Sequence, residues 1–197
     1  LAASTPSLRV VRSRSGRILA ADGTTDGTAS AEVYDPVSNV WNEVSSPSAV
    51  RAGGALFLTS DGHALLAGGV SAPSKPRVIY TNAALASTEV WDEAKDKWSQ
   101  GPPMNQRRAT FVGLAMPGGA FAAIGGFDPS GDGSPGSPVR TVDEFDGKAW
   151  RLLPELPVPF DNPRNAATLP NGQLLVLSAS GVDGRSGIVP KAALTAG

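Results

Sequence analysis

The sequence contains no cysteine and a single histidine, His63. Without thiols the chain can form no disulfide bond, no thiolate metal site and no cysteine nucleophile. His63 follows a Ser-Asp-Gly triplet that predicts a turn, and no serine nucleophile motif accompanies it, so we interpret it as a solvated turn residue. The residue types therefore predict no catalytic constellation, no metal site and no cofactor.

The chain also lacks a long apolar run and an excess of charge of one sign. No stretch approaches the roughly 18 apolar residues of a transmembrane helix, so we predict no membrane span. The net charge is −1, and no basic stripe is present that would attract nucleic acid, so we predict no nucleic-acid partner. Hydrophobic residues make up 41% of the chain, which is enough for a packed core.

Glycine and proline, in contrast, are plentiful, with 23 and 17 residues. This content predicts many turns. The apolar runs are short, are bounded by Gly, Pro, Asn and Asp, and show no helical period over any long window. We therefore predict an all-β fold.

Similar segments repeat along the chain. Trp41, Trp98 and Trp150 are separated by 57 and 52 residues (98 − 41 and 150 − 98). Each tryptophan follows a segment with an acidic residue, an aromatic residue and an aspartate, which two shorter apolar runs precede. The repeated residues are the acids Glu32, Glu89 and Glu144, the aromatics Tyr34, Trp91 and Phe145, the aspartates Asp35, Asp92 and Asp146, and the double glycines Gly68-Gly69 and Gly125-Gly126.

Each complete copy indicates four antiparallel strands within about 50 residues, which is typical of a propeller blade. The double glycine, the aromatic-Asp step and the tryptophan together resemble the kelch repeat. This resemblance implies a kelch-like β-propeller, or part of one, with about three and a half four-stranded blades in the single segment 1–197. We place blade 1 at about 8–46, blade 2 at about 51–103, blade 3 at about 107–157, a half blade 4 at about 164–181 and a tail at 182–197.

Residues that recur in every copy are predicted to be structural. The glycines permit a close backbone approach and a positive φ. The tryptophans are expected to pack between neighbouring blades, and the aspartates to bond the backbone of their own turns. The repeated glutamates are interpreted as scaffold or as a solvated face rather than as paired catalytic acids.

Arginines near the first strand of a copy are the first candidate binding residues. Arg51 and Arg108 each lie 11 residues before the aligned turn glycine (62 − 51 and 119 − 108), whereas Arg164 lies in a less secure register. The kelch resemblance places this position at the rim of a central cavity. There the arginines either bind carboxylates of a peptide or an acidic sugar, or bond loop carbonyls between blades. The sequence leaves both alternatives open.

Two loops depart from the repeat, and loops on a rigid scaffold tend to carry function. Residues 70–86 include Lys75, Arg77, Ile79 and Tyr80, a mixed apolar and basic set that suits a protein partner. Residues 127–140 are rich in Gly, Ser, Pro and Asp. Their aspartate spacing does not match a calcium-binding EF-hand, so we predict a plain flexible loop there.

These observations favour a non-catalytic, protein-binding scaffold or accessory subunit within a larger assembly or a longer chain. A protein partner or further blades are expected to cover the open propeller faces, because kelch propellers usually close a ring with more blades. Two alternatives stay open: a carbohydrate-binding or adhesion module, with a glycan as ligand, and the non-catalytic part of a larger propeller enzyme. Scarce lysine and abundant Ala, Gly and Pro are similar to the composition of bacterial chains. Because bacterial kelch-like proteins are often exported, the resemblance implies a periplasmic or cell-surface location.

Overall fold

The computed structural model describes residues 8–23, 28–71, 84–129, 136–156, 159, 163–169, 174–178 and 186–189. Within these ranges the chain forms strands, turns and one short 3-10 helix, η1 (Pro117–Gly119), and no α-helix. No helix in the described part of the chain is long and apolar enough to cross a membrane. The all-β prediction is confirmed.

Three antiparallel sheets have four strands each. Their strand orders follow the chain, apart from a hairpin inserted in the third. The first sheet contains β1 (Arg9–Arg12), β2 (Ile18–Gly23), β3 (Ala29–Asp35) and β4 (Val40–Glu43); the second contains β5 (Ala55–Leu58), β6 (Ala64–Ala67), β7 (Thr88–Asp92) and β8 (Lys97–Gly101); the third contains β9 (Val112–Ala115), β10 (Phe121–Ile124), β13 (Val142–Phe145) and β14 (Trp150–Leu153).

A fourth sheet has three described strands, β15 (Pro163–Thr168), β16 (Leu174–Ser178) and β17 (Ser186–Val189). Here the structure differs from the sequence analysis, which ended the fourth copy at residue 181 and treated residues 182–197 as a tail. β17 lies antiparallel to β16, with Leu175 opposite Ile188. The repeat did not reveal this strand because its sequence, Ser-Gly-Ile-Val, lacks the acidic residue and the aromatic that mark third strands elsewhere.

The loop at residues 127–140 is also more ordered at its ends than predicted. β11 (Phe127–Asp128) pairs with β12 (Ser137–Pro138), while residues 130–135 lie outside the described part. Phe127 is buried in a small cluster with Val70, Ala84 and Ala109. Burial of this ring anchors the first end of the loop, and the pairing with β12 holds the second end beside it.

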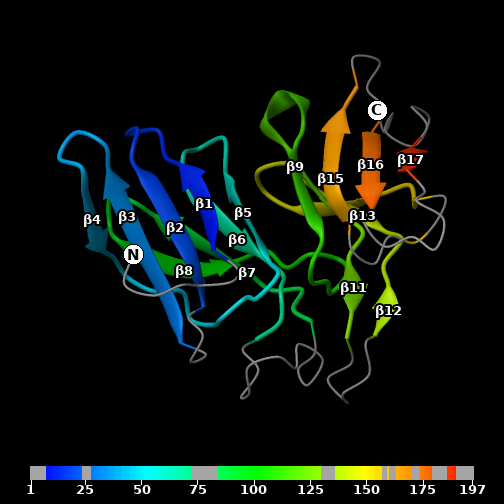
Figure 1. Cartoon of the computed structure of the whole chain (residues 1–197), viewed down its shortest axis with the longest axis horizontal. Coiled ribbons are helices and arrows are strands. Elements are labelled where there is room, and N and C mark those ends of the chain that lie inside the picture. Colours follow the sequence, from blue (N-terminus) through cyan, green and yellow to red (C-terminus); the bar gives the residue numbers. More distant parts are fainter. Residues whose placement is uncertain are drawn as a thin grey trace.

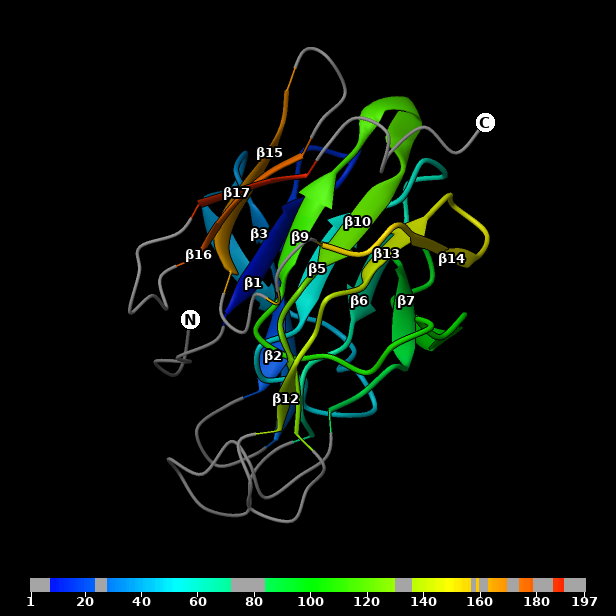
Figure 2. The ribbon, with the colours of Figure 1, turned by 90° about the vertical axis from the view of Figure 1, so that its right-hand side faces the viewer.

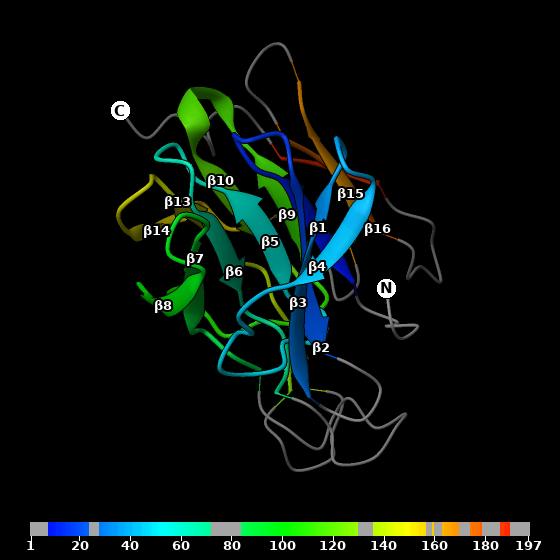
Figure 3. The same ribbon diagram turned by 90° about the vertical axis from the view of Figure 1, so that its left-hand side faces the viewer.

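The four sheets stand in a row in chain order. Their first strands are neighbours: β1 contacts β5, β5 contacts β9, and β9 contacts β15 (Figures 1 and 2). β3 and β4 lie at the outer end of this row (Figure 3). The sheets therefore converge along their first strands.

Neighbouring sheets pack face to face, and the same two kinds of face meet at each junction. Each of the first three sheets carries a cross-strand aromatic pair on one face, which we call its aromatic face, and we call the opposite face its reverse face. The ring centroids are 5.2 Å apart in Tyr34–Trp41, 6.4 Å in Trp91–Trp98 and 5.1 Å in Phe145–Trp150. The aromatic face of the second sheet packs on the reverse face of the first, where Trp91 meets Leu19 and Val33.

The same relationship recurs at the next junction. Phe145 and Trp150 pack on the reverse face of the second sheet, against Phe57 and Leu65. The reverse face of the third sheet, which includes Ile124, then packs on the fourth sheet. Burial of each large aromatic side chain contributes roughly 2–3 kcal/mol, so these junctions hold the row together. In this order, the aromatic face of the first sheet has no described sheet against it.

The double glycines mark a close approach within each sheet. Gly69 has a φ of +85°, and a Cβ atom there would lie 2.5 Å from the carbonyl oxygen of Arg51. Gly126 has a φ of +92°, and its Cβ would lie 2.5 Å from the carbonyl oxygen of Ala109. Both requirements exclude other residues, because a side chain would clash and the left-handed backbone is costly for them.

Candidate functional site

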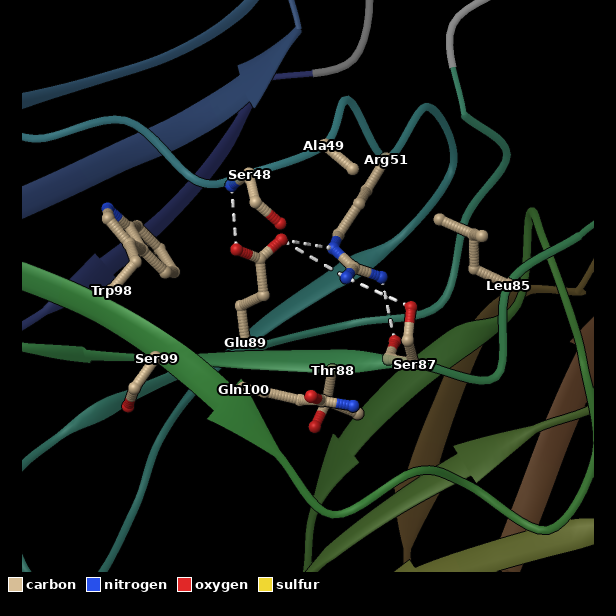
Figure 4. A pocket seen from close by; sticks show the side chains of 10 residues that line it. All are labelled: Ser48, Ala49, Arg51, Leu85, Ser87, Thr88, Glu89, Trp98, Ser99 and Gln100. Atoms are coloured by element: carbon tan, nitrogen blue, oxygen red, sulfur yellow. Dashed lines mark hydrogen bonds and ion pairs between the residues drawn. The ribbon is translucent and has the colours of Figure 1, made fainter.

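Arg51 precedes β5 and is buried, with 3% of its surface exposed. Its Nε and Nη2 atoms donate to Oε1 of Glu89 at 3.2 and 3.1 Å (Figure 4). Nη1 donates to the carbonyl oxygens of Ser87, at 2.7 Å, and Gly68, at 3.3 Å, and Nη2 also donates to Ser87 Oγ at 3.1 Å. All three guanidinium nitrogens therefore donate to groups of the chain itself.

Arg108 repeats this arrangement in the third sheet, 57 residues later (108 − 51). Its Nη1 donates to the carbonyl oxygens of Gly125 and Thr141, each at 2.9 Å, and its Nη2 donates to Thr141 Oγ1 at 2.8 Å. Nη2 also forms an ion pair with Asp143, and both side chains are fully buried. Arg108 thus corresponds to Arg51, and Asp143 to Glu89.

Each of these acids also accepts a hydrogen bond from a residue outside its own strand. Glu89 Oε2 accepts from the backbone amide of Ser48 at 2.7 Å. Asp143 Oδ1 accepts from the backbone amide of Asn105 at 3.0 Å and from its side-chain amide at 2.7 Å. Ser48 and Asn105 belong to the connections that enter the second and third sheets. We call this arrangement of arginine, acid and connection the clasp.

The clasp corrects the alignment of the repeated acids. The sequence repeat aligns Glu144 with Glu89, but the strand pairing places Glu89 opposite Leu66 and Asp143 opposite Ala123 at the same register. Glu144 is one residue further, so its side chain lies on the reverse face, where it bonds Arg151. A shift of one residue moves a side chain to the other face of a strand.

Burial and the paired acid act in opposite directions on each arginine. Burial lowers the pKa of the Arg51 guanidinium below its ordinary value, and the Glu89 carboxylate opposes this shift. The pKa of Arg108 is lowered by the same cause and opposed by Asp143. Arginine nevertheless stays charged in proteins, so each clasp holds a compensated ion pair.

This geometry favours the structural interpretation of Arg51 and Arg108 over the binding of an external carboxylate. A bidentate grip on a ligand needs free N–H groups on one edge of the guanidinium. The acceptors lie in the arginine's own sheet, however, and not between blades as the structural alternative expected. Arg164 lies in β15, but its side chain is outside the described residues, as are Lys75, Arg77, Ile79 and Tyr80.

The repeated aspartates all close turns. Asp35 Oδ1 accepts from the amides of residues 37 and 38, Asp92 Oδ1 from those of residues 94 and 95, and Asp146 Oδ1 from those of residues 148 and 149. This is the contact by which aspartate stabilises a turn. The tryptophans differ in burial: Trp150 is buried, whereas Trp41 and Trp98 are half-buried.

A pocket of about 300 Å³ lies beside the clasp of the second sheet (Figure 4). The connection between β4 and β5 and the strands β7 and β8 form it. Its lining includes Ser48, Arg51, Ser87, Glu89, Trp98 and Gln100. The indole Nε1 of Trp98 donates to the carbonyl oxygen of Ser45 at 2.7 Å, which holds the ring at the pocket edge.

A second hollow, of about 280 Å³, surrounds His63. His63 Nδ1 lies 3.2 Å from Asp61 Oδ1, and Nε2 lies 3.7 Å from Asp92 Oδ2. A hydrogen bond from Thr59, together with His63, lowers the pKa of Asp61 to about 2. These contacts join two turns of the second sheet. No cluster of three His, Cys, Asp or Glu side chains suited to a metal ion occurs among the described residues.

Comparison with known proteins supports the fold alone. The sequence matches no protein-family model and no curated protein. The solved structure of YjhT is similar, with a TM-score of 0.66 and 15% sequence identity. The match covers 87% of this chain and 58% of YjhT, so the chain spans less than two thirds of that protein.

Proposed function

We propose that this chain is part of a kelch-like β-propeller and acts as a non-catalytic protein-binding scaffold. In this proposal, the aromatic face of the first sheet receives a further four-stranded unit of the same repeat. The observation that carries the proposal is the partial exposure of Tyr34 on this face, because its counterparts in the second and third sheets, Trp91 and Phe145, are buried.

The exposed face is apolar where a neighbouring sheet would pack. Trp91 and Phe145 are each 3% exposed, whereas Tyr34, at the same position in the first sheet, is half-buried, as is its partner Trp41. Val10 lies on this face and is 57% exposed. Exposed apolar patches of this kind mark contact sites, because water contact with them is unfavourable.

The expected occupant follows from the two junctions inside the chain. At both junctions, an aromatic face packs against the reverse face of the preceding sheet. That reverse face presents residues such as Leu19 and Val33 in the first sheet, and Phe57 and Leu65 in the second. A sheet of this kind would cover Tyr34 as the first sheet covers Trp91. The converging first strands and the same pairing of faces at each junction also support a propeller, because blades arranged around an axis meet in this way.

Cysteine footprinting tests the proposal directly, because the natural chain contains no cysteine. We would compare Val10→Cys with Val37→Cys, a turn position that is 95% exposed, in the native particle purified from its source. The proposal expects maleimide to label position 10 at least about tenfold more slowly than position 37. Equal labelling rates in the native particle would overturn it.

A photo-crosslinking residue at position 34 then identifies the occupant. The proposal expects crosslinks to a strand of another four-stranded repeat unit, whether on the same chain or on a second subunit. Crosslinks to a helical protein, or none, would contradict the proposed occupant.

A further inference from the structure

We infer that the pocket beside the clasp of the second sheet binds a neutral saccharide. This inference is independent of the proposed function, because the pocket lies on β7, β8 and the connection before β5, away from the open aromatic face. It rests on the charge balance of the pocket, the polar groups that line it, the position of Trp98, and the contrast with the third sheet.

The charge balance of the pocket excludes a strongly charged ligand. Among the described residues of its lining, Arg51 and Glu89 are the only ionisable side chains, and they neutralise each other at 3.1 Å. Each guanidinium nitrogen of Arg51 already donates within the chain. An anion would find no free cation among the described residues that line the pocket, and a cation would compete with Arg51 for Glu89. A neutral ligand avoids both the cost of burying an unpaired charge and the cost of breaking the Arg51–Glu89 ion pair.

The remaining polar groups suit hydroxyl groups. Ser48 and Gln100 can each donate and accept hydrogen bonds, as a sugar hydroxyl does. The side chains of Ser48 and Gln100 are exposed and make no hydrogen bond within the described part of the chain. They are therefore available to a ligand without loss of an internal contact.

Trp98 adds an aromatic surface to the edge of this polar pocket. It is half-buried, and its hydrogen bond to Ser45 restricts the rotation of the indole. The C–H face of a pyranose ring is apolar and can pack on such a surface. The volume of about 300 Å³ is at the small end of ligand pockets, so we expect one or two sugar rings to be bound.

The clasp of the third sheet lacks these features, although its core contacts are the same. There, the side chain of Asn105 turns inward and donates to Asp143, and Trp150 is buried. At the equivalent place in the second sheet, Ser48 contributes only its backbone amide to Glu89. The second sheet therefore departs from the repeat at the positions that line the pocket, as expected of a ligand site on a repeated scaffold.

Binding of neutral sugars to the purified protein tests the inference. The probe is a panel of neutral mono- and disaccharides of glucose, galactose, mannose and N-acetylglucosamine, measured by calorimetry and by tryptophan fluorescence. We expect at least one member to bind and to change the fluorescence. Gln100→Ala and Ser48→Ala should each weaken that binding about three- to tenfold, the effect of one lost hydrogen bond.

The controls separate a local effect from a loss of structure. Asn42→Ala and Ser38→Ala remove an exposed amide and an exposed hydroxyl from the first sheet, and both should leave the affinity unchanged. The inference is overturned if no neutral sugar binds, if only acidic sugars bind, or if Gln100→Ala and Ser48→Ala bind like the wild type. None of these outcomes bears on the labelling of position 10.

Discussion

The Arg51 guanidinium lies against the Glu89 carboxylate, with Nη2 and Oε1 3.1 Å apart and both side chains buried. Glu89 also accepts a hydrogen bond from the amide of Ser48, so one carboxylate on β7 joins this strand to the connection that enters the sheet. Arg108 and Asp143 repeat this relationship in the third sheet. The repeat indicates that the clasp positions each sheet relative to the connection that enters it.

Removal of one clasp partner should be costly. Glu89→Ala leaves a buried guanidinium uncompensated, and we expect the free energy of unfolding to fall by about 3–5 kcal/mol. Replacing both partners, as in Arg51→Met with Glu89→Leu, should cost less than Glu89→Ala alone, because no buried charge remains. Urea denaturation measures these differences. Glu93→Ala is the control, since its pair with the partly exposed Arg17 contributes about 1 kcal/mol or less.

The corrected alignment of the acids makes a separate prediction for the third sheet. Asp143→Ala should lower the free energy of unfolding by about 3–5 kcal/mol, because it leaves the fully buried guanidinium of Arg108 without its counter-ion. Glu144→Ala should cost about 1 kcal/mol or less, because its partner Arg151 is half exposed. Thermal or urea unfolding measures the loss of stability in each of the two variants. A larger effect at position 144 would contradict the assignment of Asp143 to the clasp.

The double glycine should tolerate no side chain. Gly69→Ala would place Cβ 2.5 Å from a backbone oxygen at a φ of +85°, and we expect a loss of more than about 2 kcal/mol of stability. Gly118 offers a matched control: its φ is +80°, but no atom lies within 4 Å of its added Cβ. Gly118→Ala should cost only the left-handed backbone term, about 1–2 kcal/mol. Similar losses in the two variants would show that close approach plays no part.

Asp61 should make stability depend on pH in the acid range. Its pKa is about 2 in the folded chain, against an ordinary value of 3.8, because Thr59 donates a hydrogen bond to it. A lowered folded pKa means that the carboxylate favours the folded state. This contribution is complete above about pH 4 and is lost as the pH falls from about 4 to 2. The effect is small because the side chain is largely exposed.

A comparison of the melting temperatures of Asp61→Asn and the wild type measures the pH-dependent contribution of Asp61 to stability. The difference in melting temperature should shrink as the pH falls from about 4 toward 2. Thr59→Val should reduce the same pH dependence, because it removes the hydrogen bond that lowers the pKa. A difference that stayed constant down to pH 2 would contradict the assignment.

The local pattern was sufficient to predict much of the fold. Short apolar runs bounded by turn residues identified the strands of the first three sheets, because strand formation there depends on neighbours along the chain. β17 was missed for the converse reason. Its four residues carry no marker of their own, and they form a strand because β16 offers an edge for pairing.

The candidate site was less predictable. The spacing of Arg51 and Arg108 showed that they are equivalent, but spacing cannot tell a free guanidinium from a buried one. Their acceptors, at Ser87 and Thr141, lie more than 30 residues away along the chain (87 − 51 = 36 and 141 − 108 = 33). Only the pairing of β6 with β7, and of β10 with β13, brings these groups together.

The sequence by itself determined the strand identity, the turns closed by aspartate and the positions where only glycine fits, because each depends on residues close together in the chain. The tertiary structure decided which acid completes each clasp, since the register of paired strands assigns a side chain to one face or the other. It also decided that Tyr34 is half-buried while Trp91 and Phe145 are buried. Burial of a repeated residue depends on the sheet that packs against it, and identical repeat positions differ in their neighbours.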